Sequence, residues 1–285
     1  MGTAKLIDGK VISAKVLSDV ADEVKDLKQR GVEPCLAVIL VGEDPASQVY
    51  VRNKKLKCEQ VGIRSLSYTL PADTKQEELI SLIKELNERK DVNGILCQLP
   101  LPSHLNEKDV INTISAEKDV DAFNPENVGH IMIGDASFLP CTPAGVMEML
   151  KYEGISAAGK HCVVIGRSNI VGKPMALLLL QDNGTVTVCH SRTKNLAEYT
   201  KEADILVSAV GKRNLITADM IKEEAVIIDV SINRNEDGKL CGDVDFDNVL
   251  DKASYITPVP GGVGPMTIAM LMKNTVTAAK NQNNI

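Results

Sequence analysis

The chain has 285 residues, of which 44% are hydrophobic and 25% charged, as is typical of a globular protein with two domains of moderate size. Its net charge of −6, five Tyr, three Phe and no Trp argue against a nucleic-acid-binding protein, which needs basic surfaces and stacking platforms. No apolar run approaches the roughly 18 residues of a membrane span, and the N-terminus lacks the apolar stretch of a signal peptide, so we expect a cytoplasmic protein without membrane contact.

The first half of the chain alternates short apolar strands with amphipathic helices, the pattern of a parallel α/β sheet. Ser47 is the expected N-cap of the second helix and Gly62 its stop, and the Gly- and Pro-containing region 115–140 is expected to be irregular. The spacing predicts helices over 12–27, 47–61 and 74–89, and strands over 35–41, 63–70 and 92–98.

The second half repeats this alternation after a helix over 143–152. We expect strands over 161–166, 185–190, 204–210, 225–232 and 255–260, and helices over 174–181, 194–203, 217–224 and from 266 onward. The predicted fold class is α/β with two lobes, an N-terminal parallel α/β substrate lobe and a Rossmann-type dinucleotide-binding lobe. The expected bounds are 1–140 for the first lobe, to which the helix over 265–285 returns, and 141–264 for the second.

The seven cysteines are widely separated and include no CxxC pair, and the four histidines lack metal-binding spacing. We therefore interpret the cysteines as reduced thiols and expect no metal site.

A glycine-containing turn, GRSNIVGKP (166–174), follows a predicted strand and opens a helix, an arrangement that holds a pyrophosphate on backbone N–H groups. It departs from the GxGxxG pattern, because Ser168 replaces the second glycine and Gly172 comes one residue late. The candidate cofactor residues are Gly166, Arg167, Ser168 and Gly172; a turn without a ligand is the alternative interpretation.

The end of the next predicted strand bears on the choice of cofactor. NAD enzymes usually place an acidic residue there to bind the ribose 2′-OH, but residues 189–193 read Cys-His-Ser-Arg-Thr. Arg192, beside Ser191, could neutralise a 2′-phosphate together with Arg167, which favours NADP without excluding NAD. Both arginines could instead be merely solvated. Gly211 and Ile232, at the ends of two later strands, are further candidates, with ordinary turns as the alternative.

Tyr50 and Lys54 are four residues apart on a predicted helix and therefore share a face. Arg52, Lys55 and Lys57 lie around them, so one interpretation is a solvated basic surface. The other is a lysine that faces a cleft, where burial and the neighbouring cations would lower its pKa and make it a base.

Three further features could bind a ligand. Gln98 ends a predicted strand and can both donate and accept hydrogen bonds. Asp121 could bind an aminopyrimidine-type ring through two parallel hydrogen bonds, although Asp119 competes for that role and could instead cap a turn. The string PVPGGVGPMT (258–267) would let the backbone approach a ligand closely, unless its glycines only shape a turn.

In their order along the chain, five strings resemble the bifunctional methylenetetrahydrofolate dehydrogenase/methenyltetrahydrofolate cyclohydrolase family. They are ASQVYVRNKK (46–55), GILCQLPLP (94–102), KDVDAFNPENVG (118–129), GRSNIVGKP (166–174) and TPVPGGVGPMT (257–267). The resemblance implies oxidation of 5,10-methylenetetrahydrofolate with NADP, hydrolysis of the methenyl product to 10-formyltetrahydrofolate, and a homodimer built on the second lobe. A two-lobed NADP dehydrogenase of a small hydroxy acid and a non-catalytic dinucleotide-binding sensor are the alternatives.

The resemblance also implies roles for individual residues. Lys54 would carry the cyclohydrolase proton transfer and Gln98 would tune it, while Tyr50 positions the folate ring and Asp121 holds the pterin. Ser47, Pro260, Gly261, Gly262 and Val263 would line the folate site. Three residues depart from the family pattern: Ala122 and Ser231 replace Gly, and Asn124 replaces His. We expect Ala122 to shift the backbone beside Asp121, and Ser231 to crowd the nicotinamide.

Overall fold

The computed structural model describes residues 3–285, and the chain divides into two compact units. Unit 1 comprises Met1–Ser13 and Thr142–Thr267, and unit 2 comprises Ala14–Cys141 and Ile268–Ile285. The divisions fall at or within three helices, α1 (Gly9–Gln29), α6 (Cys141–Tyr152) and α10 (Val263–Gln282). The first residues of the chain thus group with the second lobe, whereas the expected bounds placed them in the first.

Unit 2 is built on a parallel three-stranded sheet in the order β3-β2-β4. The strands are β2 (Cys35–Val41), β3 (Arg64–Leu70) and β4 (Gly94–Cys97), close to the predicted ranges. Every residue of the central strand β2 is buried, because helices cover both faces of a parallel sheet and its sequence CLAVILV is apolar throughout.

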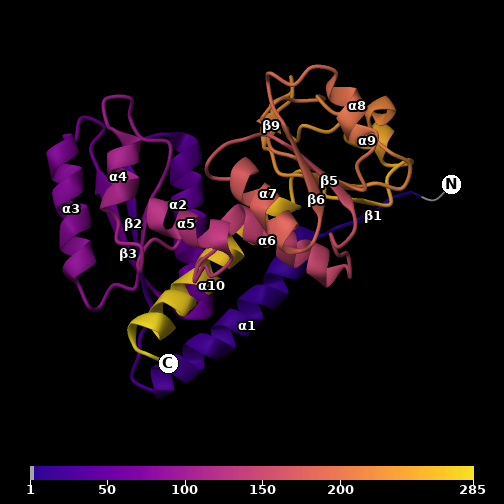
Figure 1. Ribbon diagram of the computed structural model, residues 1–285. Coiled ribbons are helices and arrows are strands. Elements are labelled where there is room, and N and C mark those ends of the chain that lie inside the picture. Colours follow the sequence, from indigo (N-terminus) through magenta and orange to yellow (C-terminus); the bar gives the residue numbers. More distant parts are fainter. Residues whose placement is uncertain (1–2) are drawn as a thin grey trace. The chain divides into compact units, whose positions relative to one another are not determined.

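Helices α3 (Gln76–Glu88) and α4 (Glu107–Thr113) pack on one face of this sheet, whereas α2 (Pro45–Val61) lies on the other side (Figure 1). Leu79, Ile83 and Leu86 recur at helical spacing on α3 and form its buried face. The unit 2 parts of α1 and α10 lie side by side (Figure 1), joined by the ion pair of Glu23 and Lys280.

Two local predictions for unit 2 were wrong. Asp44, and not Ser47, is the N-cap of α2, and its carboxylate accepts a hydrogen bond from Ser47 N at 2.7 Å. The region 115–140 contains a helix, α5 (Pro125–Ile133), whose N-cap is Asn124. Gly62 does end α2, in the predicted left-handed conformation with φ of 81°.

Unit 1 contains a six-stranded parallel sheet in the order β1-β11-β8-β7-β5-β6. The order reverses at β5, since β6 lies on one side of it and β7 on the other; ligands of such sheets bind at this switch point, beyond the carboxyl ends of the strands. The strands are β1 (Lys5–Leu6), β5 (His161–Ile165), β6 (Thr185–Cys189), β7 (Ile205–Ser208), β8 (Val226–Asp229) and β11 (Tyr255–Ile256).

Short elements complete unit 1. They are α7 (Gly172–Gln181), α8 (Leu196–Thr200), α9 (Phe246–Val249) and an antiparallel hairpin of β9 (Asn233–Arg234) and β10 (Leu240–Cys241). The predicted helix over 217–224 was wrong, since only Ala218–Met220 form a single 3₁₀ turn and the backbone is extended at Ile221.

The two parallel sheets confirm the predicted α/β fold class. Within residues 3–285, no helix combines the length and the hydropathy that a membrane crossing requires. All seven cysteines are unpaired, and six of them are buried.

Candidate active site and dinucleotide-binding loops

Lys54 belongs to the buried face of α2. The side chains of Ser47, Lys54, Cys58 and Val61 recur at helical spacing and are all buried, with Lys54 only 8% exposed. Arg52 and Lys55, by contrast, are exposed. The solvated basic surface therefore exists on this helix, but Lys54 is not part of it.

The amine of Lys54 faces a neutral acceptor. Its Nζ donates a hydrogen bond to Gln98 Oε1 at 2.9 Å. Gln98 follows β4, where its N–H donates to Ile39 O at 2.8 Å and its Nε2 donates to Leu99 O at 2.6 Å. Because Nε2 is held by Leu99, the amide oxygen is the atom that Gln98 presents to Lys54.

Burial lowers the pKa of Lys54 below 10.5, because the charged ammonium loses its hydration. The negative charge of Asp121 opposes this effect and raises the pKa. We had expected the neighbouring cations to contribute, and this was wrong: burial alone lowers the pKa, since water screens the exposed charges of Arg52 and Lys55.

Asp121 is half-buried, and burial raises the pKa of its carboxyl, while Lys54 lowers it. The thiol of Cys141 lies against this carboxylate, and burial together with Asp121 raises the pKa of that thiol. Asn274, on α10, donates to Val120 O at 2.8 Å and so fixes the residue before Asp121. Sequence reasoning missed Cys141 and Asn274, because neither belongs to a motif that we recognised as functional.

The competing carboxylate, Asp119, shapes the chain around the site. Its Oδ2 accepts hydrogen bonds from Asn124 N at 2.7 Å and from Asn127 Nδ2 at 3.0 Å. It is 2% exposed, and burial raises its pKa to about 6. Asp119 thus organises the turn into α5, and Asp121 is the carboxylate that acts on Lys54.

Two further residues of the predicted motifs are Ala122, which follows Asp121, and Tyr50, which precedes Lys54 on α2. Ala122 has φ of 57°, a left-handed conformation that costs an alanine roughly 1–2 kcal/mol. Its N–H donates to Asp119 O at 3.0 Å, which keeps it in the turn. Tyr50 lies one helical turn before Lys54 and is 37% exposed, and burial of its ring raises the pKa of its hydroxyl.

The loop between β5 and α7 in unit 1 requires glycine at two positions. Gly166 has φ of 121°, and a Cβ there would collide with Ala209 O in the loop after β7. A Cβ on Gly172 would collide with Gly166 O. The start of this loop is therefore packed tightly against the loop after β7 and against the first residue of α7.

This loop presents unpaired backbone N–H groups. Ser168 Oγ accepts hydrogen bonds from Val171 N at 3.1 Å and from Gly172 N at 3.2 Å, so it caps the start of α7. The amides of residues 167–170 donate no hydrogen bond within the part of the chain that the structure describes, and these residues are exposed. Such a row of free amides fits an anionic phosphate.

The turn after β6 lies next to this loop, because Gly166 N donates to Cys189 O at 2.9 Å. His190 N donates to Thr193 Oγ1 at 2.9 Å and Arg192 N donates to His190 Nδ1 at 3.1 Å, which closes the turn. Ser191 and Arg192 are exposed on it, as Arg167 is on the loop. The two arginines are available to an anion bound at this end of the sheet.

The ends of β7 and β8 carry the last two cofactor candidates, Gly211 and Ile232. Gly211 N donates to Ser231 Oγ at 3.0 Å, so the two strand ends are linked, and the side chain of Ile232 is 47% exposed. The hydroxyl of Ser231 in turn donates to Asp243 at 2.7 Å. Ser231 therefore directs its hydroxyl to a buried carboxylate.

The glycine-rich turn before α10 is shaped by the packing of unit 1 itself. A Cβ on Gly262 would lie 2.5 Å from Pro258 O, and a Cβ on Gly9 would collide with Gly262 O. Gly261 has φ of 106°, and Pro260 is exposed while Val263 is buried. At Gly262, internal packing is thus a sufficient reason for glycine.

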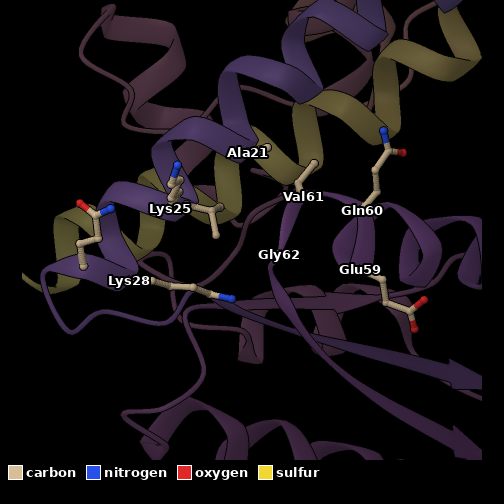
Figure 2. Close-up of a pocket in the computed structure, with 9 residues that line it drawn as sticks. Ala21, Lys25, Lys28, Glu59, Gln60, Val61 and Gly62 are labelled. Carbon is tan, nitrogen blue, oxygen red and sulfur yellow. The ribbon is translucent and has the colours of Figure 1, made fainter.

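A groove of about 520 Å³ on unit 2 lies between α1 and the end of α2 (Figure 2). Lys25 and Lys28 line it from α1, and Glu59 and Gln60 line it from α2. It contains none of the predicted site residues, so we do not assign it to the reaction.

Comparison with known proteins assigns the residues around Lys54 and the loop at 166–172 to two domains of one family. A family model for the catalytic domain of tetrahydrofolate dehydrogenase/cyclohydrolase matches residues 7–121. The NAD(P)-binding domain of the same family matches residues 140–283. The chain belongs to the tetrahydrofolate dehydrogenase/cyclohydrolase family.

Relatives of this family match the chain over almost its whole length. A bifunctional FolD protein of Lachnoclostridium phytofermentans is 62% identical over 277 residues, which cover 97% of this chain and 98% of the relative. The crystal structure of the Campylobacter jejuni FolD enzyme is 53% identical, with a TM-score of 0.96 over 98% of this chain and 99% of that one. A Trypanosoma brucei FolD structure, complexed with NADP and an inhibitor, is 39% identical with a TM-score of 0.96, and covers 100% of both chains.

Membership of the tetrahydrofolate dehydrogenase/cyclohydrolase family confirms the resemblance seen in the sequence. The chain is an oxidoreductase and a hydrolase of folate one-carbon metabolism, a methylenetetrahydrofolate dehydrogenase and methenyltetrahydrofolate cyclohydrolase. Lys54 and Gln98 lie in the part that matches the family's catalytic domain, and the loop at 166–172 lies in the part that matches its NAD(P)-binding domain. The hydroxy-acid dehydrogenase and the non-catalytic sensor are set aside.

Proposed function

We propose that Lys54 is the general base of the cyclohydrolase step and that Gln98 holds its amine in place. The observation that carries this proposal is the hydrogen bond of 2.9 Å from Nζ of the buried Lys54 to Oε1 of the half-buried Gln98. A base must be uncharged before it accepts a proton, and burial favours the uncharged amine. A neutral amide can hold that amine in place. It stabilises the charged form of the amine much less than a carboxylate in the same place would.

The dehydrogenase step requires no general base from the protein. A bound nicotinamide accepts a hydride from the one-carbon bridge of 5,10-methylenetetrahydrofolate. The methenyl cation that remains is stabilised by its two nitrogens, so this step needs correct positioning and no side chain that moves a proton.

In the hydrolysis step, the oxygen of a water molecule bonds to the bridge carbon of the methenyl cation, and the water loses a proton to Lys54. The hydroxyl group formed on that carbon then loses its proton as the C=O bond forms, the bond from the carbon to folate N5 breaks, and N5 takes up a proton, which gives 10-formyltetrahydrofolate. General-base assistance of this kind typically accelerates a reaction by about 10²–10⁴-fold. Lys54 is therefore required for the second activity and dispensable for the first.

We further propose the folate contacts that the family resemblance implies. Asp121 offers a carboxylate that can accept two parallel hydrogen bonds from the pterin ring, and Tyr50 offers a ring one turn from Lys54 on the same helix. Ser47 and the turn that contains Pro260, Gly261, Gly262 and Val263 are the remaining proposed folate contacts.

We also propose that NADP is the preferred dinucleotide. The free amides of residues 167–170 fit a phosphate, and the adjacent turns expose Arg167 and Arg192 with no carboxylate in residues 189–193. Two guanidinium groups suit a 2′-phosphate better than the 2′-OH of NAD. The related Trypanosoma brucei structure contains NADP, which supports the same choice.

We further propose a cytoplasmic homodimer that pairs through unit 1. Strand β6 is an edge of the six-stranded sheet, and its Val188 is 39% exposed. An edge strand with exposed apolar side chains is a surface on which a second copy can pair. Seven unpaired cysteines are typical of a reducing compartment.

The central proposal is tested by following both reactions in one cuvette. With 5,10-methylenetetrahydrofolate and NADP, the wild-type protein should produce reduced dinucleotide, and the methenyl chromophore should form and then decay. Lys54→Met should leave hydride transfer measurable and abolish the decay, whereas Lys55→Met, which alters an exposed lysine of the same helix, should change neither. Equal loss of both activities in folded Lys54→Met would refute the assignment.

A further inference from the structure

Asp243 lies between β10 and α9 in unit 1 and is completely buried. Its carboxylate accepts six hydrogen bonds. Oδ2 accepts from Ser208 Oγ at 2.9 Å, Val210 N at 2.9 Å, Gly211 N at 3.3 Å and Ser231 Oγ at 2.7 Å, and Oδ1 accepts from Lys212 N at 2.7 Å and Asn233 Nδ2 at 3.0 Å. Three consecutive backbone amides and three side chains therefore converge on one buried group.

These bonds keep the carboxylate charged in spite of its burial. Burial by itself raises the pKa of Asp243, but the hydrogen bonds, first that of Val210 N and then those of the side chains, bring it below its usual value. Asp229, the other buried carboxylate of this region, accepts backbone hydrogen bonds, among them those from Val244 N at 2.8 Å and Ser231 N at 3.2 Å, and there burial prevails and raises the pKa to about 6. Asp243 is thus the fixed negative centre on which the surrounding backbone is arranged.

The segments that Asp243 holds follow β7, the neighbour of the switch-point strand β5, and β8, the next strand of the sheet. Residues 210–212 follow β7, and Ser231 and Asn233 follow β8. Strand β7 is the neighbour of β5, and the loop after β5 touches the loop after β7, since a Cβ on Gly166 would collide with Ala209 O. The free amides of residues 167–170 and the segment fixed by Asp243 therefore lie beyond the carboxyl ends of two neighbouring strands, β5 and β7, where ligands of such sheets bind.

We propose that Asp243 is a positioning residue for the dinucleotide: its carboxylate holds the loops after β7 and β8 in the arrangement that binds the cofactor. The inference rests on the proposed binding of NADP at this end of the sheet, and it does not involve Lys54. Ser231, which departs from the family pattern, strengthens the arrangement, because its hydroxyl both accepts from Gly211 N and donates to Asp243.

Asp243→Asn tests the proposal, because an amide group of the same shape can accept at only one of the two positions. The NH₂ group would face donors, either Lys212 N and Asn233 Nδ2 or the four donors that now meet Oδ2. We expect the Kd for NADP, measured by calorimetry, to rise at least about tenfold. Hydrogen exchange of the amides of residues 210–212 should accelerate in the free protein, while the cyclohydrolase rate, measured on methenyltetrahydrofolate without dinucleotide, should stay within about twofold of wild type.

Asp204→Asn is the matched control. Asp204 is a partly buried aspartate at the opposite end of β7, where it accepts from His161 N at 2.8 Å. Its substitution changes the same type of group in the same sheet and should leave the Kd for NADP unchanged. The proposal is overturned if folded Asp243→Asn binds NADP as wild type does, or if its affinity falls while the amides of 210–212 remain protected.

Ser231→Ala provides a milder variant should Asp243→Asn not fold. It removes one donor to Asp243 and one acceptor for Gly211 N, and the Kd for NADP should rise by about two- to tenfold. An unchanged Kd in this variant would also count against the proposal. The wild-type titration with NADP, made first, tests the proposed cofactor separately, and the ratio of variant to wild-type Kd tests Asp243.

Discussion

Lys54 in unit 2 and Asp243 in unit 1 are both buried ionisable residues, and the pKa of each lies below its usual value. The consequences are opposite. For Lys54 the lowered pKa favours the neutral amine, whereas for Asp243 it favours the charged carboxylate. Lys54 Nζ has a hydrogen bond to Gln98, and Asp243 accepts six.

The number and kind of hydrogen-bond partners explain this difference. A buried amine that faces a neutral amide gains little from being charged, so it can release and accept a proton. A buried carboxylate surrounded by donors is fixed in its charged form, so it holds backbone in place and takes no part in proton transfer. The same fold thus contains an amine suited to proton transfer, that of Lys54, and a carboxylate that fixes the backbone, that of Asp243.

The largest effect is expected when Lys54 is given a partner that stabilises its charged form, as the donors around Asp243 stabilise that carboxylate. Gln98→Glu would place a carboxylate at the amine, and an opposite charge at that distance typically shifts a pKa by about 1–3 units. The neutral fraction of Lys54, and with it the cyclohydrolase rate at pH 7, should fall by about ten- to a thousandfold. The rate of decay of the methenyl chromophore measures this directly.

Gln60→Glu is the control for this substitution, since Gln60 is exposed near the end of the same helix. It should leave the decay unchanged. A Gln98→Glu protein that hydrolyses the methenyl compound at the wild-type rate would show that the charge of Lys54 is irrelevant to the reaction.

The next largest effect concerns the arginines of unit 1. Arg192→Ala removes a guanidinium from the turn after β6, and the KM for NADP should rise about tenfold or more while that for NAD stays the same. Steady-state dehydrogenase kinetics with both dinucleotides make the comparison. Arg234→Ala, in the β9–β10 hairpin, serves as the control, and an unchanged ratio of the two KM values would exclude Arg192 as the reader of the 2′-phosphate.

A smaller change is expected at Asp121, whose charge raises the pKa of Lys54. Asp121→Asn removes that charge, so Lys54 loses its proton at lower pH, and the rising limb of the cyclohydrolase pH profile should move to lower pH. The KM for folate should rise in the same variant, because one carboxylate contact to the pterin is lost. A limb that stays in place or moves to higher pH would contradict the electrostatic link between the two residues.

The smallest effect is expected at Ala122, which has a left-handed backbone. Ala122→Gly relieves about 1–2 kcal/mol of strain and gives up a buried methyl group that contributes about 0.8 kcal/mol. Glycine also adds about 0.4–1 kcal/mol of chain entropy to the unfolded state, so the free energy of unfolding in urea should change by less than about 1 kcal/mol. Ala37→Gly, at a buried alanine with ordinary backbone in β2, relieves no strain and should lower it by more, and an equal loss in the two variants would show that the turn is unstrained.

Much of the fold could be predicted from local pattern. The apolar residues 35–41 and Gly62 are signals that depend only on neighbouring residues in the sequence. The structure has a strand at 35–41 and the end of a helix at Gly62. The helix α5 was missed, although its signals were present: Asn124 as N-cap, Pro125 in the first turn and Gly134 as the left-handed stop. The glycines and prolines of 115–140 were interpreted as loop residues when two of them mark the ends of a helix.

The candidate sites were predictable only in part. Lys54 and Gln98 came from motifs, but the basic string around Lys54 did not reveal which lysine is buried; that depends on the packing of α2. Asp243 could not be recognised, because its six donors come from segments 10 to 35 residues earlier in the chain. A role that rests on contacts between distant segments leaves no local pattern.

The claim that burial lowers the pKa of Lys54, and so favours its uncharged, basic form, can be tested on the residue itself. In protein with ¹³C-labelled lysine, the Cε signal that Lys54→Met removes can be followed by NMR as the pH is raised. The account predicts a midpoint clearly below 10.5, the usual value for lysine. A midpoint at or above that value would mean that Lys54 stays charged while the methenyl compound is hydrolysed, and the proposed mechanism would be wrong.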